Sequence, residues 1–431
     1  MRIQLLNHAA VIIEIDDVRL LCDPWFAGTC FAGGWGLLYD NPAAVERCRD
    51  CTHLWISHFH GDHFHVPTLK TLLEINPNIA VLGNRSYNFQ MDTALRSLGF
   101  SNVRSLPERK QLALTPAVSV TRFPTTGIDN MLLITAAGGR VLNYNDCNVP
   151  RKAERSLANQ IGQLEVLLAN FNHASKLLDF PERTPEETKR ELRDGFVSKC
   201  ESFSARWVVP FASYHYYRAP ETAAQNTSLL SLDEIAAASA RVIPLGIGQS
   251  ATIAGDQTQI EGTVVRRAQE LTRVARQQPV PMRDIQEAFR RFKRRVNISF
   301  GGLTWLLPVL RVYVSDLDRT ATISFRRGFL DQGPGEQGSH VRVHSECLFR
   351  WFSTEYGTDA FWVGGHFELC SGQLVPLRWQ LLVSLMTENR VDLWSLLKCC
   401  VVPEGWRFLW CRREEILSVL AARRFVVGSR E

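Results

Sequence analysis

Four side chains that commonly bind metals lie within six positions of the sequence. The segment from His58 to His63 reads HFHGDH, and five of the eleven histidines of the chain fall in residues 53–65. His58 and His60 are two positions apart, so on an extended segment their side chains point to the same side. Asp62 and His63 can then face a second point nearby. Such an arrangement suits two borderline cations about 3.5–4 Å apart.

The residues around this motif predict how it is held. His53-Leu54-Trp55-Ile56-Ser57 has the composition of a buried strand, and Pro67–Leu73 has helical spacing. The motif would therefore lie in the tight turn between a strand and a helix. A surface histidine cluster is the alternative, but four ligand-type residues in six positions after an apolar strand are rare by chance. We therefore predict a metal site.

Alternating elements along the chain predict a layered α/β fold with mixed sheets. Apolar runs predict strands at 3–6, 10–15, 18–22, 79–82, 118–123, 131–134, 140–144 and 207–211. Helical periods occur at 151–170, 182–200, 263–277 and 282–296.

Composition narrows the classes of protein that fit. The chain has 431 residues, which suits two domains. Its 49 basic residues against 44 acidic ones give a net charge of only +5, which does not favour nucleic acid as a partner. No run of about 18 apolar residues occurs, so no membrane span is expected. The eleven cysteines are scattered, and we recognise no secretion signal, so a reduced cytoplasmic protein is expected.

The motif and three other segments resemble a known family. HFHGDH, preceded by strands that end at Asp23-Pro24, resembles the metallo-β-lactamase superfamily. The segments LNHAA, LLCDPWF and LNYNDC resemble a branch that includes the CMP-N-acetylneuraminate hydroxylase-like proteins and the ascorbate-phosphate lactonase-like hydrolases. The resemblance implies an αββα sandwich, with a catalytic domain at residues 1–255.

The resemblance also implies a set of ligands for two metals. His58 and His60 match the pair that binds the first metal, and Asp62 and His63 match the pair that binds the second. Asp146 matches a carboxylate that bridges both cations, and with Asp62 it would be the catalytic carboxylate pair.

Five further residues are implied in or around the centre. His215 matches the last histidine of the second metal, and His173 competes for that role. Asp23 matches an aspartate that orients a ligating histidine. His8 and His65 would lie close by without binding metal.

One position departs from the pattern of the zinc hydrolases. Those enzymes usually supply a third histidine to the first metal, but His65 is the only histidine between Phe64 and Asp146. The segment 126–129 stands at the expected place, and we expect Asp129 to be the ligand; a turn-capping aspartate is the alternative. Two histidines with carboxylates resemble oxygen-activating non-haem iron sites more than tetrahedral zinc sites.

Residues 256–431 predict a C-terminal α+β module, similar to the sterol-carrier-like modules of this branch. It would bind substrate or act as an accessory domain. Trp362, His366 and Arg378 are the candidate substrate contacts, although aromatic residues of this kind more often form a core.

Two functions follow from the resemblance. The first is a di-iron monooxygenase that uses O2 as co-substrate to hydroxylate a small organic or natural-product substrate in a biosynthetic reaction. Because we recognise no Rieske, flavin or dinucleotide segment, an external ferredoxin or reductase would supply electrons. The alternative is a binuclear zinc or manganese hydrolase of a phosphodiester, lactone or amide. The sequence leaves the substrate and the oligomeric state open.

Overall fold

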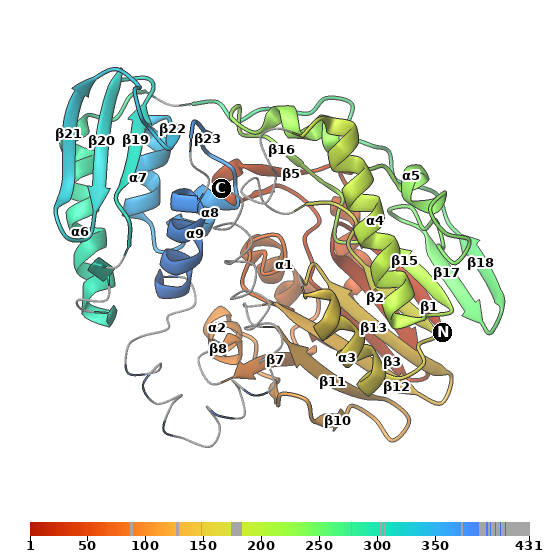
Figure 1. Ribbon diagram of the computed structural model, residues 1–431. Helices are drawn as coiled ribbons and strands as arrows, with labels where there is room; N and C mark the ends of the chain where they lie inside the picture. Colours follow the sequence, from red (N-terminus) through yellow and green to blue (C-terminus); the bar gives the residue numbers. More distant parts are fainter. Residues whose placement is uncertain are drawn as a thin grey trace.

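Two mixed sheets pack face to face in the N-terminal part of the chain (Figure 1). The computed structural model describes residues 1–86, 89–125, 129–147, 149–173, 183–276, 278–300, 304–305, 307–371 and 374–387, and positions 394, 397, 401, 406 and 410. The order of the first sheet is β18 (Gln257–Glu261), β17 (Ser250–Ala254), β1 (Arg2–Asn7), β2 (Ala10–Ile15), β3 (Val18–Cys22), β6 (His53–Trp55), β7 (Ala80–Ser86) and β8 (Phe89–Gln90), with β9 (Val103–Leu106) also on β7. The second is β10 (Gln111–Ala113), β11 (Ser119–Pro124), β12 (Asn130–Ala136), β13 (Gly139–Asn145), β14 (Val166–Ala169) and β15 (Trp207–Pro210).

The burial of β2 shows why the sheets form inner layers. Val11 and Ile13 pack into the core between the two sheets. Ala10 and Ile12 face a separate core on the outer side of the first sheet. A strand buried on both faces needs apolar residues without alternation, which is what AVIIEI supplies.

Helices cover both outer faces of the sandwich. On the first sheet lie α1 (Val66–Ile75) and α2 (Met91–Leu98), which contribute Leu69, Leu72 and Leu95 to the core. On the second lie α3 (Arg151–Ile161) and α4 (Pro185–Phe203). The predicted αββα sandwich is confirmed. The predicted helix at 151–170 is wrong in its second half, because Gly162 at φ 77° ends α3 and residues 166–169 form β14.

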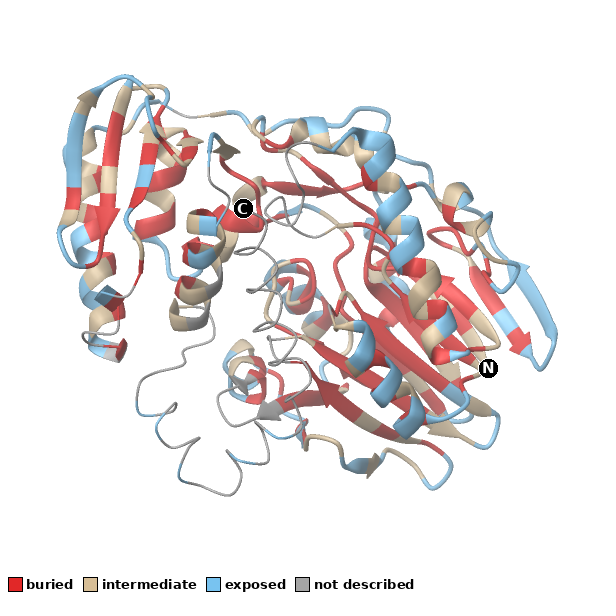
Figure 2. Ribbon diagram, in the orientation of Figure 1, coloured by how far each residue is buried: buried red, intermediate tan, exposed pale blue. Residues whose placement is uncertain are grey.

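A second core lies in the C-terminal part of the chain. The sheet β21 (Gly328–Pro334), β20 (Arg319–Ser324), β19 (Leu310–Val314), β22 (Val341–Val343) and β23 (Glu368–Leu369) is accompanied by α6 (Met282–Phe300), α7 (Ser345–Ser353), α8 (Gly357–Trp362) and α9 (Leu374–Thr387). Figure 2 shows the buried residues on the inner sides of these elements. Phe289, Phe292, Trp351 and Trp379 are buried together, so the predicted amphipathic helix at 282–296 is confirmed.

The predicted helix at 263–277 is wrong for every position of it that the structure describes. Residues 263–276 run as an extended strap across the small sheet of β16 (His215–Tyr217), β5 (Trp35–Leu37) and β4 (Thr29–Cys30). Ala268 N donates to Leu38 O, and Val274 N donates to Arg218 O. Backbone bonds to the N-terminal part therefore replace those of a helix.

The C-terminal part meets the N-terminal part at a loop before β5. Trp35 Nε1 donates to Val363 O at 3.0 Å, and His366 Nε2 lies 2.9 Å from Phe31 O. A Cβ atom at Gly34 would lie only 2.3 Å from Gly364 O. The two backbones therefore touch without a side chain between them. No helix in the described part of the chain meets the length and apolarity that crossing a membrane requires.

Gly34→Ala tests this contact. The added methyl group has no room, so we expect the free energy of unfolding to fall by about 1–3 kcal/mol, measured by urea denaturation. Gly138→Ala is the matched control, because a Cβ atom there meets nothing within 4 Å. Equal stability of the two variants would show that the backbones do not meet in this way.

Candidate metal centre

The end of β6 is held by three side chains before the histidine motif begins. Asn84 Nδ2 donates to Ile56 O and to Ser57 O, and Trp55 Nε1 donates to Asn84 Oδ1. Asn130 Nδ2, from the second sheet, also donates to Ser57 O at 2.7 Å. The chain therefore leaves the strand in a fixed direction, and His58 follows at once.

The first cluster of ligand-type atoms joins His58, His60 and Asp129. Their ligand atoms lie within 4.8 Å of one another. His58 Nε2 faces His60 Nδ1 at 2.9 Å and lies 3.7 Å from Asp129 Oδ1. Ser57 Oγ is 2.8 Å from His58 Nδ1, so it can fix the orientation of that ring. The structure thus brings Asp129 to the place where the sequence analysis expected a first-metal ligand; residues 126–128 before it lie outside the described residues.

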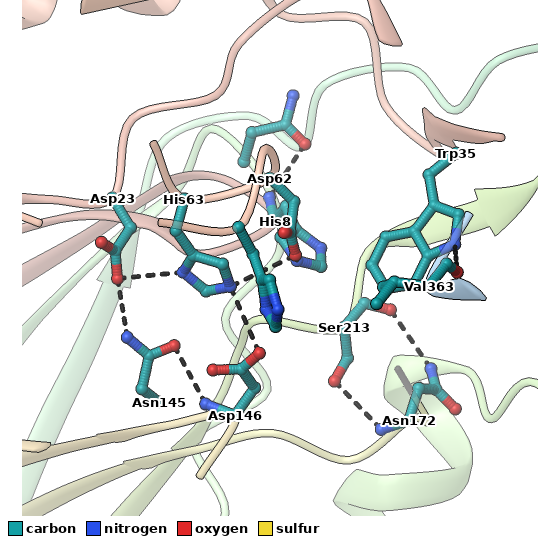
Figure 3. A network of polar contacts seen from close by, with 12 residues as sticks. His8, Asp23, Trp35, Asp62, His63, Asn145, Asp146, Asn172, Ser213 and Val363 are labelled. Carbon is teal, nitrogen blue, oxygen red and sulfur yellow. Dashed lines mark hydrogen bonds and ion pairs between the residues drawn. The ribbon is translucent and has the colours of Figure 1, made fainter. Parts of the chain in front are cut away.

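A second cluster of ligand-type atoms joins His58, His63 and Asp146. His63 lies at its middle, and carboxylates surround its ring (Figure 3). His63 Nδ1 is 3.2 Å from Asp23 Oδ2, and His63 Nε2 is 3.2 Å from Asp62 Oδ2 and 3.4 Å from Asp146 Oδ2. Asp146 Oδ2 is also 3.8 Å from His58 Nε2. Asp146 therefore lies between the two clusters, as expected of a carboxylate shared by two cations.

The turn after β13 places Asp146. Asn145 has φ 61°, and its Oδ1 accepts the backbone N–H of Asp146 at 2.9 Å. Asn145 Nδ2 donates to Asp23 Oδ2 at 2.7 Å. Asparagine tolerates this left-handed conformation better than most residues do, so the YND segment is suited to the turn.

His8 lies closer to the centre than the sequence analysis expected. Its Nε2 is 3.2 Å from Asp62 Oδ2, and His8, Asp62 and His63 form a third triple of ligand-type atoms within 4.8 Å. His8 O accepts the backbone N–H of Ala212, which ties the loop after β15 to this residue. His8 therefore lies among the ligand-type atoms and not only beside them.

His215 lies next to this triple. Its ring centroid is 5.3 Å from that of His8, and it stacks on Trp35 at 3.9 Å with an interplanar angle of 12°. Ser213 and Asn172 hold the loop before it by mutual hydrogen bonds (Figure 3). Trp35 was not singled out from the sequence, because its contact with His215 joins residues 180 positions apart.

Three predicted site residues have other partners in the structure. His65 caps α1, with Nδ1 2.8 Å from Thr68 Oγ1. His173 O accepts from Tyr217 Oη, and His173 is in none of the three triples. His366 bonds Phe31 O and lies 3.2 Å from Arg276 Nη1.

The three candidate substrate contacts differ in their surroundings. Trp362 is fully buried in the C-terminal core, and Arg378 is exposed on α9. His366 lines a cavity of about 20 Å³, which has room for a water molecule but not for an organic substrate. Neither Trp362 nor Arg378 lines this cavity.

The buried charges of the centre fit cations. Burial lowers the pKa of His58 well below its usual range and that of His215 to about 3, so both rings are neutral, as ligands must be. Burial alone would lower the pKa of His63 as well, but Asp62, Asp146 and Asp23 raise it well above its usual value. When no cation is bound, a proton on His63 offsets part of the carboxylate charge, and a bound cation would take the place of that proton.

Orphaned polar atoms give an independent test of that fit. Among the described residues, Asp62 Oδ1, Asp146 Oδ1 and both ring nitrogens of His215 are buried without a hydrogen-bond partner. Leaving such atoms unsatisfied costs about 1–3 kcal/mol each. Metal coordination would satisfy the two carboxylate oxygens and one nitrogen of His215, so the residues present fit a pair of cations.

Comparison with known proteins identifies the fold class. Residues 2–176 match the beta-lactamase superfamily domain. The sandwich is a metallo-β-lactamase fold.

Two sequence relatives are cytidine monophosphate-N-acetylneuraminic acid hydroxylases. The mouse (Mus musculus) protein is 24% identical over 225 residues, which cover 49% of this chain and 39% of the mouse protein. The human (Homo sapiens) protein, which is named as inactive, is 28% identical over 225 residues, covering 49% of this chain and 45% of the human protein. The chain therefore matches less than half the length of these curated relatives.

Two solved structures are similar at a lower level. Isothiocyanate hydrolase from Delia radicum gut bacteria has a TM-score of 0.47 and 13% identity over 59% of this chain and 100% of its own. CmlA, a diiron beta-hydroxylase from Streptomyces venezuelae, has a TM-score of 0.39 and 17% identity over 53% of this chain and 46% of its own. Likenesses this weak carry no functional conclusion.

Asp23→Asn tests the support of His63. The variant keeps the shape of the side chain but loses the negative charge beside Nδ1, so we expect affinity for Zn²⁺ to fall about 10- to 100-fold. Calorimetric titration of the metal-free protein measures it. Asp17→Asn, at an exposed turn, is the control. Unchanged affinity in Asp23→Asn would contradict the role assigned to Asp23.

Proposed function

We propose that the chain is an O2-dependent monooxygenase with two iron ions, which hydroxylates a small organic substrate. The observation that carries this proposal is the His58–His60–Asp129 cluster, because two imidazoles with a carboxylate are the ligand set of oxygen-activating non-haem iron. The similarity of half the chain to cytidine monophosphate-N-acetylneuraminic acid hydroxylases supports the same class of reaction.

In this proposal the side chains hold, orient and shield the cations. His58, His60 and Asp129 would bind the first ion, and the second would be bound by Asp62, His63 and His215, with His8 beside them. Asp146 would bind both. The iron pair supplies the binding and reduction of O2.

The remaining tasks fall to the residues around these ligands. Ser57 and Asp23 fix the rings of His58 and His63. Burial, and next the charge of Asp146, raise the pKa of Asp129 to about 7, so its carboxyl group can hold a proton near neutral pH until a cation replaces it. Phe31 and Trp35 pack against His60 and His215 and exclude water from that side.

The reaction needs an electron source. Hydroxylation takes one oxygen atom of O2 into the substrate and reduces the other to water, which requires two electrons and two protons. An external ferredoxin or reductase is proposed as the donor. Gly333–Gly338 has GxGxxG spacing, but β22 and not a helix follows it. It therefore lacks the helix N-terminus on which a dinucleotide phosphate would bind.

A binuclear hydrolase is the second candidate, favoured by the other half of the centre. His8, His63 and His215 place three imidazoles around Asp62. A site rich in imidazole suits zinc. In this alternative the zinc pair would activate water for hydrolysis of a phosphodiester, lactone or amide, and Asp129 would only neutralise charge.

Metal content distinguishes the two candidates. Protein produced in iron-supplemented medium should hold about two irons per chain and absorb from the near ultraviolet into the visible, measured by elemental analysis and spectroscopy. The control His173→Ala should retain both ions. Two tightly held zinc ions in a colourless protein would contradict the oxygenase proposal and favour the hydrolase.

Asp129→His tests the first cluster directly. A third imidazole in place of the carboxylate should lower bound iron to about one per chain and abolish oxygen uptake by the reduced protein, while zinc binding persists. Asp129→Glu keeps a carboxylate and should retain iron. Full iron content and oxygen uptake in Asp129→His would show that a carboxylate is not needed at this position.

A further inference from the structure

One carboxylate from the C-terminal part of the chain reaches the candidate metal centre. Asp359, in the first turn of α8, has its Oδ2 3.8 Å from His60 Nε2. Both side chains are largely buried, at 15% and 22% exposure. His60 and Asp359 are about 300 positions apart in the sequence, so the contact depends on how the two parts of the chain pack.

The orientation of Asp359 is fixed from its other side. Ser384, on α9, donates its Oγ–H to Asp359 Oδ1 at 2.7 Å. The carboxylate therefore turns one oxygen to α9 and the other to the imidazole. The hydrogen bond from Ser384 therefore fixes the orientation of the Asp359 carboxylate toward His60.

The two nitrogens of His60 face different partners. Nδ1 faces His58 Nε2 at 2.9 Å, inside the first cluster, while Nε2 faces Asp359. Histidines that bind metal through one nitrogen usually donate the N–H of the other to a carboxylate or carbonyl. A distance of 3.8 Å is longer than a hydrogen bond, and a shift of about 0.8 Å would bring the pair within bonding range.

The same segment also touches the other half of the centre. Val363 O, just after α8, accepts from Trp35 Nε1, and the Trp35 ring stacks on His215. Asp359 thus contacts His60 of the first proposed metal site directly. Val363 contacts His215 of the second site through Trp35. The close approach of Gly34 and Gly364 fixes the spacing between the two parts at this point.

We propose that Asp359 is a positioning residue for His60, and that α8 completes the first metal site from outside the N-terminal sandwich. This proposal rests on the proposed function insofar as His60 binds metal through Nδ1. Asp359 accepts the Nε2–H of His60, fixes the tautomer that leaves Nδ1 for the cation, and increases the basicity of that nitrogen. The C-terminal part of the chain is then part of the metal centre as well as a packed neighbour.

Titration of the metal-free full-length protein with Co²⁺ alone tests the proposal, with the visible cobalt spectrum and calorimetry as readouts. Asp359→Asn should weaken one of the two sites about 10- to 100-fold and leave the other unchanged. Asp359→Glu, which keeps the acceptor, should restore most of that loss. Asp92→Asn is the matched control: Asp92 is also a buried carboxylate that accepts from a serine, Ser105, but it lies on α2 in none of the metal-binding triples.

A second background separates positioning from a general structural role. In His60→Ala, the further change Asp359→Asn should have no effect on Co²⁺ affinity, because the ring that it orients is gone. Three outcomes would each overturn the proposal. They are an equal loss of Co²⁺ affinity at both sites in Asp359→Asn, a loss that persists in the His60→Ala background, and unchanged affinity in Asp359→Asn. If Asp359→Asn does not fold, Ser384→Ala releases the carboxylate instead; it should weaken the same site, and wild-type affinity there would overturn the proposal.

The outcome for the wild-type protein distinguishes this proposal from the one on which it rests. Wild-type protein that fails to bind two Co²⁺ ions would overturn the binuclear centre and with it the role of Asp359. Two ions in the wild type, with no selective loss in Asp359→Asn, would leave the binuclear centre in place and overturn the positioning role alone.

Discussion

The buried carboxylate of Asp23 holds the candidate metal centre together. Asp23 directly follows β3 and has φ 42°, and its Oδ1 accepts the backbone N–H of Ser57, just after β6. Its Oδ2 accepts from Asn145 at the end of β13 and lies 3.2 Å from His63 Nδ1. One side chain therefore joins three strand ends from two sheets and orients a ligand-type ring. Its loss would leave several buried donors without an acceptor, which costs more than any one of these bonds contributes.

The carboxylates gathered around His63 explain why the centre needs positive charge. Asp23, Asp62 and Asp146 all lie within 3.4 Å of the His63 ring. Three carboxylates in a buried space repel one another strongly, because little water remains to screen them. Either a proton on His63 or bound cations must offset that charge, so the arrangement of ligands and the stability of the fold are linked. Beside this space, Asp359 of α8 lies against His60, and Trp35 stacks on His215.

Local pattern predicted most of the sandwich and the first half of the centre. The apolar runs at 10–15, 53–57 and 140–144 predicted strands, and the structure has a strand within each of these runs. Most residues of these strands are buried, which is why their sequences are apolar. The prediction failed where a helical period had a stronger competitor. At 166–169 the backbone joined a parallel ladder with β13 and β15, and at 263–276 it bonded the small sheet instead. Tertiary hydrogen bonding overrode weak helical propensity in both places.

What the sequence alone determined is the chemistry that neighbouring residues share: the HFHGDH turn, the strand that leads into it, and the YND segment after β13. These depend on spacing and backbone preference within a few residues, which the sequence states directly. Only the tertiary structure decided that Asp129 faces His58, that His8 lies against Asp62, that Trp35 stacks on His215 and that Asp359 approaches His60. Each of these contacts joins residues about 50 to 300 positions apart, and their meeting depends on sheet order and on how the second core packs. No local pattern carries that information, because the free energy that fixes these contacts comes from burial of the apolar faces of whole sheets and helices.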